Sequence, residues 1–200
     1  KKFVIRKITL NLMGRHNVLN ATAAIVTSIT LGISIKKIKH TLKNFLGVQR
    51  RLTKVYESKR RIIFDDYAHH PTEIEAVLSA CKNSFKEKKI ISVFQPHRFS
   101  RVESLYKEFT KCFSKSDLVI LCPVYAAGEK NIKFNLEQFG KKISKNSKTE
   151  VIIIKDEKNL NIFLNKNSST NELIIAMGAG NISEWIRSIS KKLTNDKIKY

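Results

Sequence analysis

Short apolar runs alternate with longer amphipathic stretches over most of the chain. Apolar runs of roughly four to six residues predict buried strands, and apolar residues spaced three or four positions apart predict helices. The predicted strands are residues 52–56, 61–65, 90–94, 118–122, 151–154 and 173–177. The predicted helices are residues 71–85, 100–113, 136–145, 157–165 and 182–192.

Residues at the starts of these helices agree with the pattern. Pro71 stands in a predicted first helical turn, where proline is favoured. Ser100 and Glu103 form a Ser-x-x-Glu capping box, and Asp156 is expected to cap the helix that follows it. Because short strands alternate with helices, we expect βαβ units and an α/β fold built on a mostly parallel sheet.

The beginning of the chain shows a different pattern. Residues 3–10 alternate apolar and basic side chains and predict a strand, which Gly14 ends. Helices are predicted at residues 17–30 and 35–45, and Gly47 is expected to cap the second one at its C-terminus.

Two hundred residues suit one domain, or one domain plus a piece of another. One strand and two helices with a broad apolar face are too little to fold alone. We therefore expect residues 1–48 to be the tail of a preceding domain and residues 49–200 to form a domain of their own.

The net charge of +21, from 38 basic and 17 acidic residues, would attract nucleic acid or anionic lipid non-specifically. However, the lysines are scattered over almost every segment, and no long single-sign tail occurs. We interpret them as solvated helix and loop faces and do not expect a specific nucleic-acid site.

The three cysteines, Cys81, Cys112 and Cys122, lie far apart among apolar residues and form no Cys-x-x-Cys unit. We expect buried, reduced thiols and no zinc site. The sequence opens without a signal peptide, and no apolar run reaches the roughly 20 residues of a membrane span. We expect a cytoplasmic protein with no membrane association.

Polar clusters follow four of the predicted strands, where ligands gather in parallel sheets. They occupy residues 65–71, 95–101, 123–129 and 178–181. In the first, Asp66, Tyr67 and His69 suggest a binding site, although His70 and one aspartate could simply cap the next helix. In the third, an ordinary turn explains each residue equally well.

The second cluster carries Arg98 and Arg101 beside His97, at a predicted helix start. Guanidinium groups bind carboxylate or phosphate with two hydrogen bonds, so this loop predicts an anion site. In the fourth cluster, Gly178 and Gly180 could cradle phosphate, but close packing of strand and helix explains the pair as well.

Six segments together resemble the Mur ligase family. They are Gly-Arg-His-Asn-Val-Leu-Asn-Ala (14–21), Gly-Val-Gln-Arg-Arg (47–51), Asp-Asp-Tyr-Ala-His-His-Pro-Thr-Glu-Ile (65–74), Phe-Gln-Pro-His-Arg-Phe-Ser-Arg (94–101), Val-Tyr-Ala-Ala-Gly-Glu (124–129) and Gly-Ala-Gly-Asn-Ile (178–182). The resemblance covers essentially the whole chain. It implies that residues 49–200 are the family's Rossmann-like C-terminal domain, and that residues 1–48 are the tail of its central ATP-binding domain.

The resemblance also implies a reaction of peptidoglycan synthesis. ATP phosphorylates the lactyl carboxylate of UDP-N-acetylmuramate, and the amine of L-alanine then attacks the acyl phosphate, with Mg²⁺ present. Carried over by position, the nucleotide-binding residues would be His16, Asn17, Arg51 and Asp66. The residues that bind the other substrates would be Tyr67, His69, His97, Arg98 and Arg101. Arg51 and His97 would also act in catalysis.

One family motif does not occur: the sequence contains no Gly-x-x-x-x-Gly-Lys-Ser/Thr phosphate loop. The magnesium ligands are expected outside this chain as well, so we expect it to be inactive without the N-terminal and central domains. A shortened form, a split or degraded gene product and one half of a two-chain enzyme all stay open.

Two other functions remain as alternatives. A related ligase recycles whole peptides onto the muramate sugar and shares the Asp-Asp-x-x-His-His-Pro loop, but the loop at residues 97–101 suits a small amino acid's carboxylate better. A basic nucleotide- or nucleic-acid-binding module would instead bind in a strongly salt-dependent manner and tolerate Asp66→Ala.

Overall fold

The computed structural model describes residues 4–12, 14–45, 47–130, 134–166 and 171–197. The chain divides into two units, Lys1–Val48 and Gln49–Tyr200. This division lies where the pattern of apolar residues changes along the sequence.

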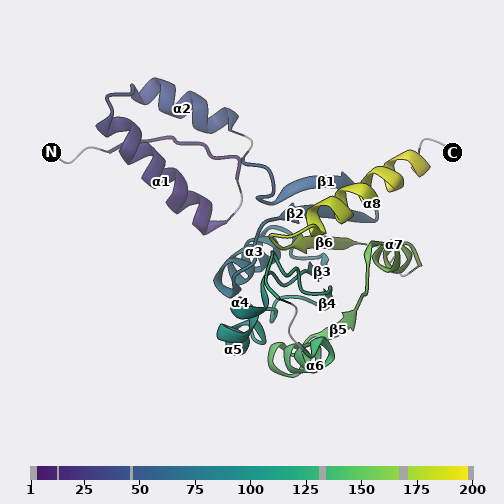
Figure 1. Ribbon diagram of the computed structural model, residues 1–200. Coiled ribbons are helices and arrows are strands. Elements are labelled where there is room, and N and C mark those ends of the chain that lie inside the picture. Colours follow the sequence, from purple (N-terminus) through teal and green to yellow (C-terminus); the bar gives the residue numbers. More distant parts are fainter. Residues whose placement is uncertain (1–3, 13, 46, 131–133, 167–170, 198–200) are drawn as a thin grey trace. The chain divides into compact units, whose positions relative to one another are not determined.

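The first unit contains two helices, α1 (Arg15–Thr30) and α2 (Ile35–Asn44). Residues 4–12 run beside them as an extended segment (Figure 1). The Lys39 ammonium holds this segment by donating to the Arg6 carbonyl at 2.6 Å. Among the hydrophobic side chains described in this unit, Ile38 alone is buried.

The strand predicted at residues 3–10 is wrong for the part that the structure describes, because residues 4–10 form no strand. A strand needs a neighbouring ladder for its amides and carbonyls, and the described residues of this unit provide none. Gly47 is also not the predicted helix cap. Helix α2 ends at Asn44 with Phe45 in an extended conformation, and Gly47 (φ 94°) lies beyond it.

The second unit is built on a six-stranded sheet in the order β1-β2-β6-β3-β4-β5, which Figure 1 shows running from β1 to β5. The strands are β1 (Thr53–Glu57), β2 (Arg61–Asp66), β3 (Lys89–Phe94), β4 (Leu118–Leu121), β5 (Glu150–Ile153) and β6 (Glu172–Met177). β1 pairs antiparallel with β2, and all other pairs are parallel. The predicted α/β fold with a mostly parallel sheet is confirmed.

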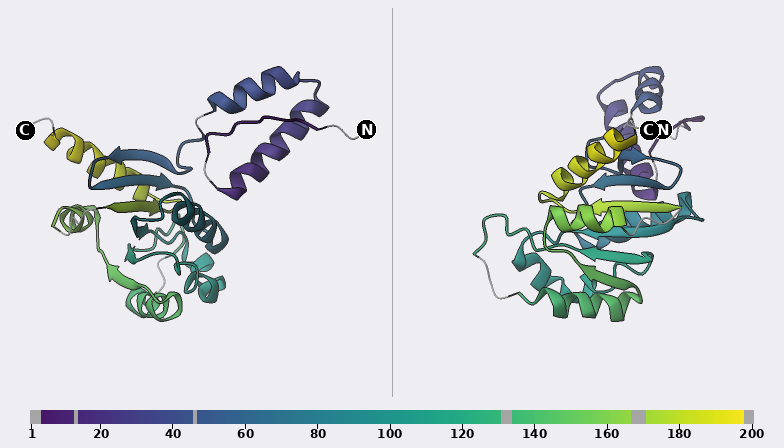
Figure 2. Two further views of the ribbon diagram at one scale, coloured as in Figure 1. Left: turned by 180° about the vertical axis from the view of Figure 1, so that it is seen from behind. Right: turned by 90° about the vertical axis from the view of Figure 1, so that its right-hand side faces the viewer.

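Helices lie on both faces of this sheet (Figure 2). They are α3 (Pro71–Ser84), α4 (Phe99–Ser104), α5 (Tyr106–Phe109), α6 (Leu136–Ser147), α7 (Glu157–Lys166) and α8 (Ile182–Lys197). On one face, Leu160 of α7 and Ile186 of α8 pack with sheet residues such as Ile91. On the other, the Phe94 ring lies 5.7 Å from that of Phe109.

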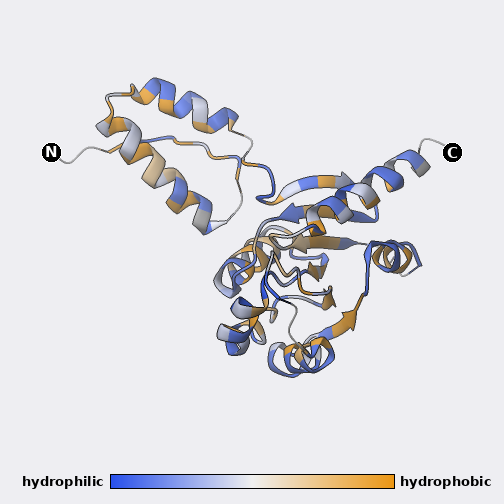
Figure 3. Ribbon diagram, in the orientation of Figure 1, coloured by the Kyte–Doolittle hydropathy of each residue, from blue (hydrophilic) through white to orange (hydrophobic). Residues whose placement is uncertain are grey.

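The core follows from the apolar strands. All six residues of both β2 and β6 are buried, and Figure 3 colours β5 and much of β6 orange. Buried strands of this kind must be covered on both faces, which is what the helices achieve.

The single helix predicted at residues 100–113 is wrong, because the structure has two short helices there. Leu105 (φ −116°, ψ 26°) interrupts them. The predicted capping box is also wrong: Arg98 is the N-cap, and the Ser100 hydroxyl donates to Glu129 instead. The Ser100 side chain therefore forms a tertiary hydrogen bond in place of the local capping bond that the sequence predicts.

Cys81, Cys112 and Cys122 are buried free thiols, as predicted. Burial raises the pKa of Cys81 to about 12, with a smaller contribution from the Asp66 carboxylate, and burial raises the pKa of Cys122 to about 12. Thiolates are therefore scarce at neutral pH. Within the described residues, no helix combines the length and the apolar character that crossing a membrane requires.

Candidate functional site

The carboxyl ends of the parallel strands are aligned in register. Asp66 and Phe94 both pair with Met177, and Phe94 also pairs with Leu121. The loops that follow β2, β6, β3 and β4 therefore start at one edge of the sheet. These are the four polar clusters of the sequence, and the fold brings them together as the strand-end argument predicts.

A row of aromatic side chains connects three of these loops. The Tyr67 and His69 rings lie 5.1 Å apart edge to face, and the His69 and His97 rings lie 5.9 Å apart. The His97 ring then stacks on Tyr125 at 5.6 Å with an interplanar angle of 16°. The first three are half-buried and Tyr125 is exposed, so the row offers ring faces and polar ring atoms to a ligand.

His97 is held by Arg101, whose guanidinium nitrogen lies 3.3 Å from His97 Nδ1. Arginine can only donate, so Nδ1 accepts and the ring proton of neutral His97 lies on Nε2. Partial burial lowers the pKa of His97, and the charges of Arg101, His69 and Arg98 lower it further. His97 is therefore a neutral group whose Nε2–H can donate to a substrate oxygen.

The backbone around Arg98 is unusual for a residue with a side chain, because its φ is 69°. Its amide donates to the Tyr125 carbonyl at 2.9 Å, and the Tyr125 amide donates to the Pro96 carbonyl at 2.8 Å. These two bonds attach the loop after β4 to the loop after β3. The Arg98 side chain remains exposed.

Glu129 strengthens the same attachment. Its carboxylate accepts hydrogen bonds from the hydroxyl and the amide of Ser100. The hydrogen bond from the Ser100 side chain is the main cause that lowers the pKa of Glu129, and desolvation opposes it.

The two neighbouring aspartates face different surroundings. Asp65 Oδ2 accepts from Ser183 Oγ at 2.7 Å and from Arg187 Nε at 2.8 Å, both on α8. Asp66 Oδ2 accepts from the Leu52 amide at 2.7 Å, and its Oδ1 accepts from the Ala68 amide at 2.8 Å. Both carboxylates thus accept hydrogen bonds from other groups of the protein.

Arg50 and Arg51 both lie beside Tyr67. The guanidinium carbon of Arg50 is 4.6 Å from the Tyr67 ring centroid, and that of Arg51 is 5.8 Å from it. Arg50 also donates to the carbonyls of Gly178 and Gly180, whereas Arg51 is exposed. Of the pair, Arg51 has the side chain that can reach a dissolved ligand.

Close packing explains why glycine occupies positions 178 and 180. A Cβ on Gly180 would lie 2.5 Å from Gln95 Oε1 and 2.6 Å from Tyr125 Cγ, and one on Gly178 would lie 2.8 Å from the Gln95 carbonyl oxygen. Gln95 Oε1 also accepts from the Ile182 amide at 3.1 Å. The glycine pair therefore lets the loop after β6 pass between its neighbours, which favours packing over phosphate binding.

His70 has a structural role. Its Nδ1 accepts from the Thr72 amide, and the Glu73 carboxylate accepts from the His70 amide, which caps α3. This is the capping role that the sequence leaves open for His70.

Three contributors to the site were not among the residues that the sequence assigned to it: Arg50, Gln95 and Tyr125. All three stand in segments that carry the family resemblance, and Gln95 and Tyr125 also follow predicted strands, but no role was assigned to them. Arg50 and Gln95 depend on β6 lying between β2 and β3, and nothing local in the sequence signals that order.

His16 and Asn17 lie at the start of α1 in the first unit. The Asn17 amide donates to the carbonyl of Gly14, which is the N-cap and whose φ of 94° suits glycine. Asn17 is half-buried.

No group of three or more His, Cys, Asp or Glu side chains among the described residues could hold a metal ion.

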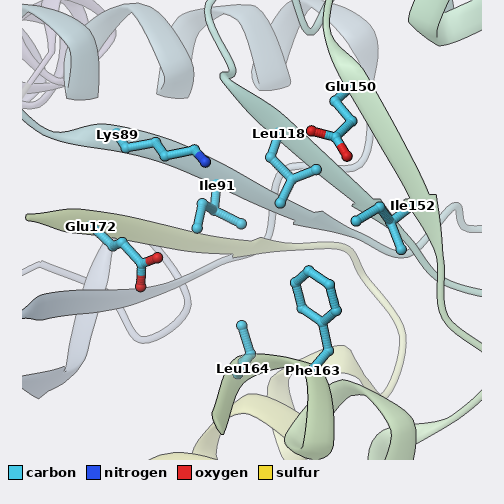
Figure 4. Close-up of a pocket in the computed structure, with 8 residues that line it drawn as sticks. All are labelled: Lys89, Ile91, Leu118, Glu150, Ile152, Phe163, Leu164 and Glu172. Carbon is cyan, nitrogen blue, oxygen red and sulfur yellow. The ribbon is translucent and has the colours of Figure 1, made fainter. Parts of the chain in front are cut away.

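A concavity lies at the opposite, amino edge of the sheet (Figure 4). It has a volume of about 200 Å³ and is lined by sheet residues and by Phe163 and Leu164 of α7. On its rim, Glu172 forms a buried ion pair with Arg61 at 3.4 Å. These are core and structural groups, so the carboxyl edge is the better candidate site.

The comparison with protein families matches residues 50–180 to the Mur ligase, glutamate ligase domain. Among curated proteins, the UDP-N-acetylmuramate–L-alanine ligase of Pelagibacter ubique is 46% identical over 190 residues, which is 94% of this chain and 41% of that protein. The enzyme of the same name from Rickettsia felis is 40% identical over 197 residues, 96% of this chain and 41% of its own length. The chain thus spans about two fifths of these relatives.

Solved structures give the same result. The UDP-N-acetylmuramate–alanine ligase of Thermotoga maritima superposes with a TM-score of 0.78 at 27% identity, over 94% of this chain and 40% of that one. A murein peptide ligase of Psychrobacter arcticus superposes with a TM-score of 0.68 at 18% identity, over 94% of this chain and 39% of that one, which shows a shared fold.

Proposed function

This chain belongs to the Mur ligase family, and from that premise we propose that it is the C-terminal part of a ligase that joins L-alanine to UDP-N-acetylmuramate. The reaction would consume ATP and contribute to peptidoglycan synthesis. The observation that carries this proposal is the row from Tyr67 to Tyr125, with arginines beside it, at the edge where four strand ends meet.

The proposed chemistry has two steps. The lactyl carboxylate of UDP-N-acetylmuramate takes the γ-phosphoryl group of ATP and becomes an acyl phosphate. The amine of L-alanine then attacks the acyl carbon, the C–N bond forms, and phosphate leaves with the former carboxylate oxygen. The amine proton passes to solvent or to a nearby base.

The positions of the arginines support roles as anion ligands. We propose that Arg51, which is exposed beside Tyr67, contacts the ATP phosphates and acts in catalysis. Arg98 and Arg101 would bind the alanine carboxylate, since guanidinium groups match carboxylates well. His97 would donate from Nε2 to an oxygen of the reacting carboxyl group, because Arg101 occupies Nδ1.

Tyr67 and His69 would form the wall of the alanine and muramate pocket. We propose that Asp66 belongs to the nucleotide-binding part of the site. His16 and Asn17, at the start of α1, would contact the adenine. ATP and UDP-sugars are cytoplasmic metabolites, so we propose that the reaction takes place there.

We further propose that residues 1–48 are the tail of the central ATP-binding domain. The exposure of Val18, Leu19 and Val26 on α1 supports this, because a folded domain normally covers such side chains. The sequence carries no phosphate loop, so we propose that the chain does not turn over by itself. Mg²⁺ would neutralise phosphate charge in the complete enzyme, from ligands outside this chain.

A chimeric enzyme tests the proposal. This chain would replace the matching C-terminal two fifths of the Pelagibacter ubique ligase, and phosphate release would be measured with ATP, UDP-N-acetylmuramate and L-alanine. We expect release that requires all three substrates. A folded chimera that releases phosphate only with a free cell-wall peptide in place of L-alanine would point to the peptide-recycling ligase, and one inactive with both would contradict the proposal.

Arg101→Lys in the chimera should raise KM for L-alanine by about tenfold or more, because the two-pronged guanidinium contact is lost. Lys141→Ala, an exposed change on α6, is the matched control and should leave KM unchanged.

A further inference from the structure

Arg51 lies between two residues with left-handed backbones, Arg50 (φ 59°) and Leu52 (φ 46°). Residues with side chains rarely adopt this conformation, and a bulky residue such as leucine least readily. Two such residues within three positions persist only where the surroundings hold them. The turn at residues 49–52 is therefore strained, and neighbouring groups must hold it in this conformation.

The backbone of this turn is held by the start of the loop after β2. The Tyr67 amide donates to the Arg50 carbonyl at 2.7 Å. Asp66 Oδ2 accepts from the Leu52 amide at 2.7 Å, while its Oδ1 accepts from the Ala68 amide at 2.8 Å. Asp66 is only 2% exposed, so its bonds form out of solvent, where a charged acceptor contributes most.

The Arg50 side chain holds the turn from the other side. Its guanidinium donates to the carbonyls of Gly178 at 2.7 Å and Gly180 at 3.2 Å and lies over the Tyr67 ring. The chain thus uses one arginine as a structural tie and leaves the next one, Arg51, exposed.

We infer that Asp66 and Arg50 are positioning residues, which fix the strained turn and so aim Arg51 at its ligand. This inference rests on the proposed role of Arg51 as a phosphate contact. It differs from a direct nucleotide role for Asp66, because the carboxylate acts here through the backbone of Leu52.

The substitution Asp66→Asn distinguishes a role in positioning the turn from direct contact with the nucleotide. Asp66→Asn keeps the shape, but its amide group has one acceptor oxygen and a donor nitrogen. One of the two backbone amides, of Leu52 or Ala68, would therefore face a donor, and the turn would lose a bond.

Amide hydrogen exchange in the full 200-residue chain tests the turn directly. We expect Asp66→Asn to raise the exchange rate of the Leu52 amide by about tenfold or more, as loss of a bond to a charged acceptor implies. Asp117→Asn is the matched control, because Asp117 Oδ2 accepts from the Ile90 amide at 2.7 Å on β3. It should leave Leu52 exchange unchanged.

Unchanged Leu52 exchange in folded Asp66→Asn would overturn the inference. Should that variant not fold, Arg50→Lys decides the question, since lysine cannot span both glycine carbonyls and stack on Tyr67 in the same way. We then expect faster exchange at Leu52, and an unchanged rate would contradict the inference.

The link to Arg51 is tested by a double-mutant cycle in the chimeric enzyme. If Asp66 acts through Arg51, Asp66→Asn raises KM for ATP in the parent but adds little to Arg51→Ala. Additive effects would instead mean that Asp66 contacts the nucleotide directly, which would overturn the positioning role. An inactive parent chimera would count against the proposed function, and the exchange experiment would still decide how the turn is held.

Relief of strain gives a second, independent readout. Glycine adopts positive φ readily, so adding Leu52→Gly should reverse much of the rise in KM for ATP that Asp66→Asn causes. Leu52→Ala removes the same side chain but keeps the strain, and should not reverse it. Equal behaviour of the two variants would speak against a strained turn.

Discussion

The two units of this chain differ in how completely each buries its own apolar side chains. Of the twelve large hydrophobic side chains that are exposed among the described residues, ten lie in residues 4–48. In the second unit, side chains as large as Phe94, Phe109 and Phe139 are fully buried. The second unit has a core closed by its own helices, whereas the first has apolar faces that its described residues leave uncovered.

The difference shows that helix formation and domain formation are separate steps. Helix α1 forms with Val18 and Leu19 exposed at 56% and 61%. An isolated helix of this length gains little stability in water, so its stability must come from burial against a partner. This agrees with the proposal that residues 1–48 are part of a larger domain.

The largest expected effect is on folding of the separated units. We expect residues 49–200 alone to unfold in one cooperative transition, because their core is complete, and residues 1–48 alone to show little helix by circular dichroism. A cooperative thermal transition in the isolated 1–48 peptide would break the comparison.

Two side-chain substitutions, one in each unit, sharpen the comparison of the two units. Phe94→Ala removes a fully buried ring and should lower the free energy of unfolding by about 3–5 kcal/mol. Leu19→Ala, at an exposed position of α1, should change it by less than about 0.5 kcal/mol. Urea unfolding of the full chain measures both, and a large loss in Leu19→Ala would show that this face is covered in solution.

Packing at the candidate site should respond to a single methyl group. Gly180→Ala would place a Cβ against Gln95 and Tyr125 and should cost about 1–3 kcal/mol. Gly140→Ala is the control, since its Cβ would meet its nearest neighbour at 3.4 Å inside α6, where alanine also favours the helix. Similar stability losses in the two variants would contradict the close-packing explanation.

The smallest effect concerns protonation at the edge of the second unit. The pKa of His97 is lowered by burial and then by Arg101, so Arg101→Gln should raise it part of the way in an NMR titration. Because the unfolded state binds this proton more readily, His97 favours folding above the pKa of unfolded histidine, about 6.5. That contribution is lost as the pH falls through the lower pKa of the folded state. A His97 pKa that does not move in Arg101→Gln would show that burial alone lowers it.

Much of the second unit could be predicted because its signals are local. Each of the six strands lies within one residue of its predicted limits, since buried strands are continuous apolar runs. The errors arose where a non-local contact decided the outcome. Ser100 bonds to Glu129 rather than capping a helix, and residues 4–10 have no neighbouring strand among the described residues to make them one.

For the candidate site, the sequence indicated the loops but not the connections between them. Arg101 follows His97 by only four residues along the chain, which is close enough for their contact. The ties of Arg50 to Gly178 and Gly180 span 128 and 130 residues, and no local pattern encodes them.

The sequence by itself determined the strands and most of the helices of the second unit, the chemistry of four loops and the family to which they point. Only the tertiary structure decided that β6 lies between β2 and β3, which brings the glycine pair against Gln95 and within reach of Arg50. It also decided that Asp66 is buried and holds the turn around Arg51. The physical reason is that strand formation depends on neighbouring residues, whereas strand order and the burial of a charge depend on contacts between distant ones.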